Sequence, residues 1–565
     1  MSTPVAADAL ALQRLYHWER TAPERVVMTQ PMGGGVVQDH TWREVLDQAR
    51  RMAAHLQAQG IARGDRVALL SKNTAHWLMC DFAIWIAGGV SVPLYPTLAA
   101  GTIRQILEHS GAKLLFVGKL DGWDAMRPGI PAGLPCIAHP LAPADAQQRY
   151  PRWDEIVAAT APLAGEPLRA ADELCTIMYT SGTTGAPKGV MHSFGTFAWS
   201  VQSGLKRVPE VDADARMLSY LPLAHVAERT LVEHGQLATG MHLYFAESLD
   251  TFTKDLQRAR PTVFFSVPRL WVKFQQGVSA KMPPAKLERL LRIPILSGIV
   301  RRKILAALGL QDCRFAAGGA APMPPELLRW YARLGLDLVE VYGMTENCGV
   351  SHATLPGRQR PGTVGLPYDG VQSRIDPASG EIQVKSPGLM LGYYREPELT
   401  RAAFTQDGWL KTGDKGEVDA EGYLRITGRV KDLFKTSKGK YVAPAPIEDK
   451  LVMHGAVEAC CVTGANLGQP LALLMLNIDA ARRAAEPAGR TELEASLAAH
   501  LQRVNELLDP HEQLDCVVVT TEAWTVDNDL ITPTFKVKRN RIEELFATHY
   551  DRWVAEGRAV VWHSA

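Results

Sequence analysis

Apolar and polar positions along the first 120 residues switch between two periods. Residues 41–60 have apolar side chains at helical spacing, with a threonine at the start and a glycine at the end, as is typical of a capped helix. The apolar run at 65–71 then predicts a buried strand. The same order of helix and strand recurs at 76–96 and at 102–118. This alternation predicts an α/β fold with a parallel sheet, in which ligand-binding loops gather at the carboxyl ends of the strands.

The pattern changes in the rest of the chain. A second α/β block extends over 217–346, and after it short strands separated by glycine and proline turns predict a β-rich subdomain. Beyond that subdomain, helical and strand signals are mixed again. We therefore predict a domain boundary near Lys431, with a large N-terminal domain at 1–429 and a small α+β C-terminal domain at 430–565.

Composition supports this division and limits the classes of partner. The length of 565 residues exceeds what one hydrophobic core usually supports, so two or more domains are expected. Hydrophobic residues make up 46% and charged residues 21% of the chain, which is typical of a soluble globular protein. With 61 Lys and Arg against 60 Asp and Glu, the formal net charge is +1, and no electrostatic argument favours a nucleic-acid partner.

The cysteines and the N-terminus indicate a cytoplasmic location. The eight cysteines include no C-x-x-C pair and no Cys/His spacing suited to zinc, so we expect neither a disulfide framework nor a metal cage. The first 20 residues lack a basic start followed by an apolar core, and we expect no secretory signal. The most apolar window, at 82–94, is interrupted by glycines and a proline and is too short to span a bilayer.

Candidate chemistry begins in the loop at 179–189, YTSGTTGAPKG, which follows the strand-like run LCTIM. Its hydroxyls and exposed backbone N–H groups suit phosphate oxygens, its glycines permit close approach, and Lys188 supplies a positive charge. It is not a Walker A loop, because Ala186 and Pro187 separate Gly185 from the lysine, and no hydroxyl follows. A flexible Ser/Thr/Gly linker is the alternative for such a composition.

Further motifs decide between these alternatives: FAAGGAAP at 315–322, VYGMTE at 341–346, WLKTGD at 409–414, GRVKDLFKTSKGKYVAP at 428–444 and TPTFKVKR at 532–539. In this order and at these separations, they closely resemble the adenylate-forming superfamily, which contains acyl-CoA synthetases, luciferases and peptide-synthetase adenylation domains. The segments LPLAHVAER, VPRLW, EVYGMTE and LITPTFKVKR look like its long-chain fatty acid CoA ligase branch. The resemblance implies a large N-terminal portion and a small, mobile C-terminal lid that rotates between two reaction steps.

The first step implied by the resemblance is attack of a carboxylate on the α-phosphorus of ATP, which gives acyl-AMP and pyrophosphate. Such a step depends on positioning and on stabilising charge, often with Mg²⁺. The family's residues for the β- and γ-phosphates correspond here to Thr180, Ser181, Gly182, Thr183, Thr184, Gly185 and Lys188. The resemblance assigns Glu346 to Mg²⁺, for which a carboxylate oxygen is a suitable ligand.

The resemblance also implies a nucleotide site formed by Gly319, Ala320, Ala321, Tyr342, Gly343, Thr345, Asp414 and Arg429. Thr345 is expected at the α-phosphate, Tyr342 against adenine and Asp414 on the ribose hydroxyls. Arg429 can donate to ribose or phosphate, although a surface ion pair is the alternative for it and for Asp414. Lys536 resembles the family's catalytic lysine, whose ammonium bridges the substrate carboxylate and the α-phosphate as negative charge develops.

In the second step implied by the resemblance, the CoA thiol attacks the acyl-adenylate carbonyl and AMP leaves. The loop around Gly439 reaches the pantetheine after the lid turns at Lys431. His225 is a candidate for the carboxylate end of the acyl site, with a satisfied buried histidine as the alternative. We expect Glu228 and Arg229 to form only a charge pair at a helix start.

A few positions depart from the family pattern or lie beside it. Phe535 precedes the catalytic lysine where many members have glycine, and Pro446 stands where a carboxylate often lies. Lys538 and Arg539 are expected to be solvated. None of these positions changes the implied chemistry.

The segment at 281–310 carries seven basic side chains against one acidic side chain, mixed with apolar runs. Such a segment can rest weakly on an anionic membrane surface and take fatty acid from it. The expected location is then cytoplasmic and peripheral to the inner face of a membrane. A solvated pair of basic helices is the alternative.

The sequence therefore predicts an ATP-dependent fatty acyl-CoA synthetase, with Mg²⁺ as cofactor and with fatty acid, ATP and CoA as substrates. An adenylating enzyme that loads a carrier protein or another acceptor is the nearest alternative. A non-catalytic fatty acid or nucleotide-binding protein is an alternative from another class, and the presence of both Glu346 and Lys536 argues against it. The motifs carry no information on acyl chain length or oligomeric state.

Overall fold

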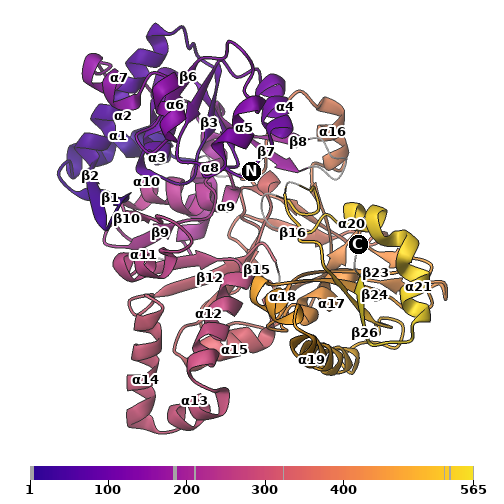
Figure 1. Ribbon diagram of the computed structural model, residues 1–565. Coiled ribbons are helices and arrows are strands. Elements are labelled where there is room, and N and C mark those ends of the chain that lie inside the picture. Colours follow the sequence, from indigo (N-terminus) through magenta and orange to yellow (C-terminus); the bar gives the residue numbers. More distant parts are fainter. Residues whose placement is uncertain are drawn as a thin grey trace.

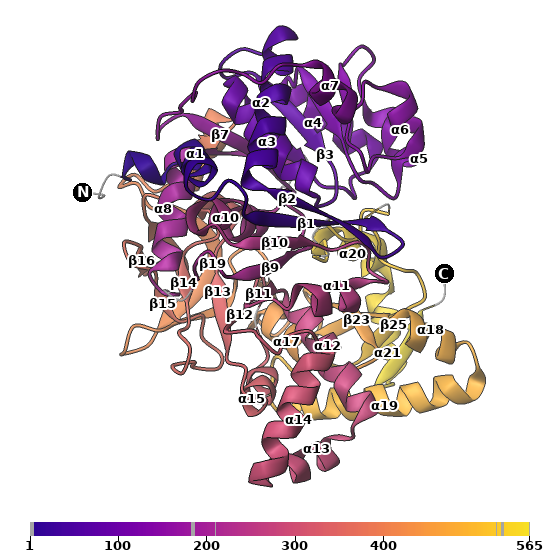
Figure 2. The ribbon, with the colours of Figure 1, turned by 90° about the vertical axis from the view of Figure 1, so that its left-hand side faces the viewer.

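The computed structural model describes residues 5–181, 187–208, 211–321, 323–526, 528–532 and 536–563. In these ranges, a large N-terminal portion built around four sheets lies beside a smaller C-terminal portion (Figure 1). The C-terminal portion, drawn in orange and yellow, sits against one flank of the N-terminal portion in Figure 1 and in the turned view of Figure 2. The predicted fold class, α/β with a β-rich part and a smaller α+β part, is confirmed.

The first sheet contains the predicted alternation of helices and strands. It holds seven strands in the order β18-β8-β7-β4-β3-β5-β6. In chain order these are β3 (Arg66–Leu70), β4 (Val90–Leu94), β5 (Leu114–Val117), β6 (Cys136–Ala138), β7 (Leu174–Ser181), β8 (Pro187–Ser193) and β18 (Gly392–Tyr393). From β6 across to β7, neighbouring strands run parallel, with Leu69 opposite Pro93 in β3 and β4.

One edge of this sheet differs from the predicted parallel arrangement. β8 pairs with β7 in antiparallel register, from Leu174 opposite Ser193 to Ser181 opposite Pro187, and β18 pairs with β8 in the same way. The prediction is wrong there because the chain turns back directly after β7, and a tight reversal joins only antiparallel strands. Residues 179–181 and 187–189, at the two ends of the predicted loop, therefore belong to paired strands.

Three predicted helices cover this sheet: α2 (Trp42–Ala58), α3 (Ala75–Ala87) and α4 (Ala100–Ser110). α2 begins with a capping box, in which Thr41 Oγ1 accepts from the Glu44 amide and the Glu44 carboxylate accepts from the Thr41 amide. Such a cap stabilises a helix by about 1 kcal/mol. α3 is buried on every side, which explains why the sequence is most apolar there. Among the helices of the described residues, none combines the length and the apolar character that crossing a membrane requires.

Two more sheets extend the N-terminal portion. One has the order β2-β1-β10-β9 and joins β1 (Val26–Gly33), β2 (Val36–Thr41), β9 (Arg216–Ser219) and β10 (His242–Phe245). The other contains β11 (Val263–Ser266), β12 (Phe315–Gly319), β13 (Leu338–Tyr342), β14 (His352–Ala353) and β15 (Leu366–Pro367). β11, β12 and β13 run parallel, so their carboxyl ends lie along one edge.

The β-rich part and the C-terminal portion have separate sheets. The β-rich sheet contains β16 (Gln372–Ile375), β17 (Glu381–Lys385), β19 (Leu410–Val418) and β20 (Leu424–Arg429). The C-terminal portion contains the pair β21 (Phe434–Lys435) and β22 (Tyr441–Val442) and the sheet of β23 (Val457–Thr463), β24 (Leu471–Leu476), β25 (Val517–Thr520) and β26 (Val560–His563). Its helices include α17 (Pro444–Leu451), α19 (Pro487–Asn505) and α20 (Arg539–Phe546). Ile447, Leu474, Leu497 and Val519 belong to its own hydrophobic core.

Glu228 and Arg229 are both buried, and they do not form the expected charge pair at a helix start. Arg229 donates to Asp81 Oδ2 at 2.5 Å, and both of these side chains are fully buried. Glu228 Oε1 instead accepts from Ser219 Oγ and from the Tyr220 amide, each at 2.9 Å. The prediction is wrong because residues adjacent in a helix point in different directions and meet different neighbours.

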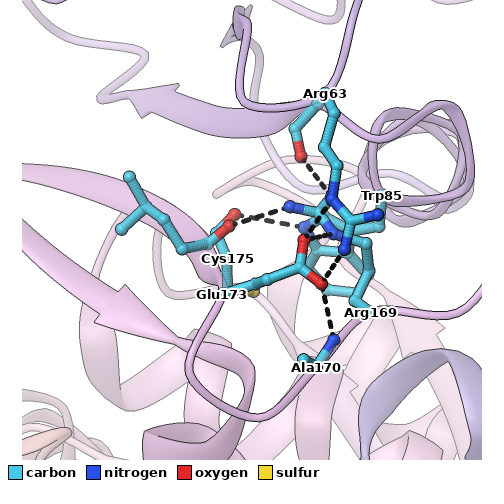
Figure 3. A network of polar contacts seen from close by, with 8 residues as sticks. Arg63, Trp85, Arg169, Ala170, Glu173 and Cys175 are labelled. Carbon is cyan, nitrogen blue, oxygen red and sulfur yellow. Dashed lines mark hydrogen bonds and ion pairs between the residues drawn. The ribbon is translucent and has the colours of Figure 1, made fainter.

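Figure 3 shows the polar network that fixes the start of β7. The Glu173 carboxylate accepts hydrogen bonds from Arg63, from Arg169 Nε and from the Ala170 amide. Arg169 also donates to the carbonyl oxygen of Gly89 at 2.9 Å. These bonds tie the residues before β7 to the turn after α3, so the strand enters the 179–189 hairpin from a fixed position.

We expect Glu173→Gln to destabilise the fold in a pH-dependent way. Burial alone would raise the pKa of Glu173, but the bonds from Ala170, Arg63 and Arg169 lower it to about 2. Because this lies below the unfolded value of about 4.3, the ionised group stabilises the fold above that value, and its contribution is lost as pH falls toward 2. The free energy of unfolding of the variant should be lower by about 1–2 kcal/mol at neutral pH. Urea denaturation at neutral pH and near pH 3 measures both values, and a difference that does not shrink at low pH would contradict the charge-based account.

Candidate active site

A cavity of about 2100 Å³ lies between the N-terminal sheets and the C-terminal portion. The predicted site residues that line it are Thr180, Lys188, His225, Ala320, Ala321, Tyr342, Gly343, Thr345, Glu346, Asp414, Arg429 and Lys536. They belong to segments that are far apart in the sequence and that meet at strand ends of three sheets and at one hairpin of the C-terminal portion.

Several predicted residues lie away from this lining or outside the described ranges. Gly319 ends β12, Gly439 lies in the turn between β21 and β22, and Lys431 lies in an exposed turn after β20, and none of them is among the lining residues of the described chain. The residues outside the described ranges are Gly182, Thr183, Thr184 and Gly185, and the side chain of Ser181 is also outside them.

Thr180 and Lys188 stand opposite each other as register partners, near the end of β7 and the start of β8. A Cβ atom on Gly189 would lie 2.7 Å from the Ile177 side chain, so the hairpin needs glycine at that position. The Lys188 ammonium lies 5.7 Å from the centroid of the Tyr393 ring. The hairpin therefore brings one hydroxyl and one cation to the cavity edge, a pair that suits anionic oxygens.

Small residues bring the ends of β12 and β13 close together. Gly319 is the register partner of Val341, and a Cβ atom on Gly319 would lie 2.8 Å from the Val341 carbonyl oxygen. A Cβ atom on Gly343 would lie 2.3 Å from the backbone of Gly349. Ala320 has a φ angle of +67°, in the left-handed region. The backbone at 320–321 and at 343 thus borders the cavity with no side chain larger than a methyl group.

Glu346 follows β13 in a short 3-10 turn, η4 (Thr345–Asn347), and is held by a residue that the sequence reasoning missed. Its Oε1 accepts a hydrogen bond from the Tyr393 hydroxyl at 2.8 Å. The second missed residue is His192, whose Nε2 lies 2.7 Å from the Thr345 carbonyl oxygen. Burial lowers the pKa of His192 to about 4, so a neutral imidazole donates to that carbonyl. Neither residue stands next to the predicted motif residues in the sequence.

Asp414 is the centre of a second polar group in the cavity. Its Oδ2 accepts from the Tyr342 hydroxyl at 2.7 Å, and its Oδ1 accepts from Arg429 Nε at 2.9 Å. Burial, and then the charge of Asp414, raise the pKa of Tyr342, so the hydroxyl stays a donor. The three residues come from β13, β19 and β20 and fix the direction of one carboxylate.

Lys536 reaches the cavity from a hairpin of the C-terminal portion. Its amide donates to Thr532 Oγ1 at 3.0 Å, and its carbonyl oxygen accepts from the Thr532 amide at 2.7 Å. The residue is exposed to the cavity. Desolvation, and then the charge of Arg429, lower the pKa of Lys536, while Asp414 and Glu346 oppose that shift. Its ammonium therefore interacts electrostatically with both carboxylates and with Arg429 of the N-terminal portion.

His225 lines the cavity near Lys536 and is neutral. Burial, and then the charge of Lys536, lower the pKa of His225 to about 4. Its Nδ1 accepts a hydrogen bond from the Ala227 amide at 3.2 Å, which places the ring proton on Nε2. The imidazole can therefore donate one hydrogen bond, and it also caps the short helix α9 (Val226–Glu228).

Arg539 is bound rather than solvated, so that prediction is wrong. Its Nη2 donates to Glu448 Oε1 at 2.5 Å, and its Nη1 donates to the Val462 carbonyl oxygen. As the first residue of α20, it points onto α17 and β23 of its own portion. Lys538 forms an ion pair with Asp529 and stays partly exposed.

Glu346 fits magnesium by its donor chemistry. Tyr393 occupies one carboxylate oxygen, and the other makes no hydrogen bond to the described residues. Those residues contain no group of three or more His, Cys, Asp or Glu side chains that could hold a metal ion. Mg²⁺ is usually bound through one or two carboxylates together with phosphates and water. A single carboxylate beside the cations of this cavity fits that mode of binding.

Comparison with known proteins agrees with the geometry. The family described as AMP-binding enzyme matches residues 15–394, and the AMP-binding enzyme C-terminal domain matches residues 431–555. The chain is 31% identical to the long-chain-fatty-acid–CoA ligase FadD15 of Mycobacterium bovis, with 94% of this chain and 95% of that protein covered. It is 27% identical to the peroxisomal long chain acyl-CoA synthetase 7 of Arabidopsis thaliana, with 95% of this chain and 85% of that protein covered.

Solved structures share the fold. The A domain of the carboxylic acid reductase from Segniliparus rugosus, in complex with AMP and a co-purified carboxylic acid, aligns with a TM-score of 0.78 at 22% identity. The alignment covers 97% of this chain and 94% of that chain. At this level of identity the similarity shows the fold.

Proposed function

The chain belongs to the AMP-binding enzyme family, and on that premise we propose that it is an ATP-dependent fatty acyl-CoA synthetase. It converts a fatty acid and ATP to acyl-AMP and pyrophosphate, and then transfers the acyl group to CoA with release of AMP. Relatives named long-chain-fatty-acid–CoA ligase and long chain acyl-CoA synthetase align over most of the chain and support this activity. The observation that carries the proposal is that Lys536, from the C-terminal portion, lines the same cavity as Lys188 and Glu346.

Each charged group of the cavity has a role in the first step. Lys188 and Thr180 bind the leaving phosphates, together with the hydroxyls and amides at 181–185. Asp414, fixed by Tyr342 and Arg429, accepts from the ribose hydroxyls. The backbone at 319–321 and at 343 borders the base, and Thr345 lies at the α-phosphate.

The carboxylate end of the acid lies between two donors. Lys536 donates to the substrate carboxylate and to the α-phosphate, where negative charge increases as the new bond forms. His225 donates through Nε2 to the same carboxylate. Glu346 would hold Mg²⁺, which supplies positive charge to the phosphate oxygens when bound.

The second step requires a different orientation of the C-terminal portion. Lys536 lies in the cavity while Gly439 lies outside its lining, so this orientation suits adenylation. We infer a domain division at 1–429 and 430–565, with Lys431 as the hinge that brings the Gly439 loop toward the pantetheine. Two reaction steps then share one cavity.

The products of turnover test this function. The protein is incubated with Mg²⁺, ATP and a panel of acids from acetate to stearate with aryl acids, with and without CoA. We expect AMP and pyrophosphate in equal amounts, and acyl-CoA when CoA is present, because the motifs match adenylation and lack a Walker A pair. ADP as the stoichiometric product would refute the proposal. Acyl-AMP without acyl-CoA would favour a carrier protein as acceptor, and ATP binding without any pyrophosphate would favour a non-catalytic protein.

We also propose a weak contact of 281–310 with an anionic membrane surface. α13 (Pro284–Leu291) and α14 (Pro294–Ala307) form a pair of helices that projects from the N-terminal portion in Figures 1 and 2. Ile295 is 81% exposed and Ile299 is 51% exposed, beside the basic side chains of the pair. Exposed apolar side chains among lysines and arginines suit an anionic lipid surface.

Sedimentation with lipid vesicles tests this contact. We expect the protein to sediment with vesicles of phosphatidylglycerol and phosphatidylcholine, less so with phosphatidylcholine alone, and less at high salt. Ile295→Ser with Ile299→Ser should reduce the bound fraction roughly 3- to 10-fold, since two apolar side chains no longer enter the interface. Leu249→Ser is the matched control, because Leu249 is 93% exposed but lies outside this segment. Failure to bind either kind of vesicle would favour the solvated helix pair, and equal binding to both would contradict a preference for an anionic surface.

A further inference from the structure

Tyr393 contacts two oppositely charged groups of the proposed ATP site. Its hydroxyl donates to Glu346 Oε1 at 2.8 Å, and the Lys188 ammonium lies over its ring, 5.7 Å from the centroid. The residue is 9% exposed and belongs to a core cluster with Val190 and Met390. One side chain therefore meets the carboxylate at its hydroxyl end and the ammonium at its ring face.

Backbone hydrogen bonds fix the position of Tyr393. β18 pairs with β8, the strand that carries Lys188, so that Tyr393 is opposite Val190. Met390 lies three residues before Tyr393, and its amide donates to the Glu346 carbonyl oxygen at 2.8 Å. The segment 390–393 thus bonds both to the strand of the lysine and to the backbone of the glutamate.

Lys188 and Glu346 form no ion pair with each other or with another residue of the described ranges. Opposite charges at short range in a partly buried site attract each other strongly, because little water screens them. Such a pair would withdraw both groups from a ligand. The ring and the hydroxyl of Tyr393 give each group a separate partner instead.

We propose that Tyr393 is a positioning residue that orients the Glu346 carboxylate and keeps Lys188 from pairing with it, so that both remain available to Mg²⁺ and ATP. The inference rests on the proposed function, because it concerns the same nucleotide site. Burial, and then the negative charge of Glu346, raise the pKa of Tyr393, and its hydroxyl stays a donor at neutral pH.

Tyr393→Phe tests the hydroxyl, with Tyr394→Phe as the matched control. The Tyr394 hydroxyl lies 3.5 Å from the Ser110 carbonyl oxygen, so this control removes a hydroxyl from the next residue in the sequence, and that hydroxyl does not contact Glu346. ATP binding is measured by calorimetry without fatty acid, so that no turnover occurs, once with Mg²⁺ and once with EDTA. We expect Tyr393→Phe to bind ATP roughly 5- to 20-fold more weakly than wild type with Mg²⁺, and within about twofold of wild type in EDTA. Tyr394→Phe should match wild type in both buffers.

Tyr393→Leu tests the role of the ring. Without the ring, Lys188 can reach Glu346, and we expect ATP binding in EDTA to weaken roughly 5- to 20-fold as well. Adding Glu346→Gln to Tyr393→Leu should restore binding in EDTA, because no carboxylate remains to hold the lysine. Thermal unfolding of each variant shows whether the fold is intact.

The outcomes separate this inference from the proposed function. Wild-type protein that binds ATP in neither buffer would overturn the function itself. If wild type binds ATP and Tyr393→Phe keeps its full response to Mg²⁺, the positioning role is wrong. A loss of equal size in both buffers for Tyr393→Phe would also overturn it, since it would indicate a general structural effect. If Tyr393→Leu does not fold, the binding of ATP to Tyr393→Phe still tests whether the hydroxyl positions Glu346.

Discussion

We expect Lys536→Ala to slow formation of acyl-AMP by roughly two to three orders of magnitude, the range typical of losing one preorganised donor to developing negative charge. Transfer of the acyl group from supplied acyl-AMP to CoA should largely survive, because the bond between the carboxylate oxygen and the α-phosphorus is already formed in that substrate. The hairpin itself should persist in the variant. Its bonds run between the backbone of Lys536 and Thr532 and do not involve the lysine side chain.

Two assays measure this effect separately: pyrophosphate release with fatty acid and ATP, and acyl-CoA formation from synthetic acyl-AMP. Lys538→Ala is the control, because Lys538 lies two residues further along the same segment and pairs with the half-exposed Asp529. Loss of such an exposed pair costs about 0–1 kcal/mol, so the control should keep its adenylation rate within a few fold. Equal losses in both assays for Lys536→Ala would contradict a role confined to the first step.

The local pattern of apolar and polar residues was sufficient to predict the first α/β block of the fold. The helix at 41–60 and the strand at 65–71 were predictable because caps, apolar spacing and short buried runs act over a few residues, and they correspond to α2 and β3. The pairing of β1 with β10 was not predictable in this way. It places Met28 opposite Leu243, and no local signal connects segments so distant in the sequence. The reversal after β7 was missed for a related reason, since a strand pattern does not reveal the direction of its neighbour.

In the candidate site, too, local sequence pattern was sufficient to predict some residues and not others. Residues such as Lys188, Glu346, Asp414 and Lys536 stand within recognisable motifs, and the structure brings them to one cavity. Tyr393 lies in no motif that the sequence analysis recognised, because an aromatic residue in an apolar segment has the pattern of a core residue. Its role depends on a hydroxyl partner 47 residues away in the sequence, and only the packing of β18 beside β8 brings the two together.

Buried charges were the least predictable feature. The sequence order of Glu228 and Arg229 indicated a charge pair at a helix start, whereas each binds a different partner in the interior. Arg539 was expected in solvent and instead binds Glu448 of α17. For Arg229 and Arg539, a long-range carboxylate compensates the cost of desolvating the charge, and such compensation has no signature in a short motif. Burial instead raises the pKa of Glu228 to about 8, and neutral groups bind its carboxyl group.

We expect Lys431→Pro to separate the two half-reactions, leaving adenylation largely intact and abolishing transfer to CoA. Lys431 lies in an exposed turn between β20 and β21, where the chain passes from the N-terminal to the C-terminal portion. In the described part of the chain its amide makes no hydrogen bond, so proline removes none. Proline holds φ near −65° and also restricts the residue before it, which removes the torsional freedom that a rotation of the C-terminal portion requires.

The orientation in the structure explains why the second step should fail rather than the first. Lys536 already lies among the cavity groups, and an ion pair between Arg269 of α12 (Pro268–Lys281) and Glu458 of β23 joins the two portions in this orientation. A hinge that cannot turn should keep the adenylating arrangement and leave Gly439 away from the cavity. Lys431→Ala is the control, because it removes the charge and keeps the torsional freedom, and both half-reactions should continue. Wild-type rates of both steps in Lys431→Pro, measured by pyrophosphate release and by acyl-CoA formation from acyl-AMP, would show that the rotation occurs elsewhere in the chain.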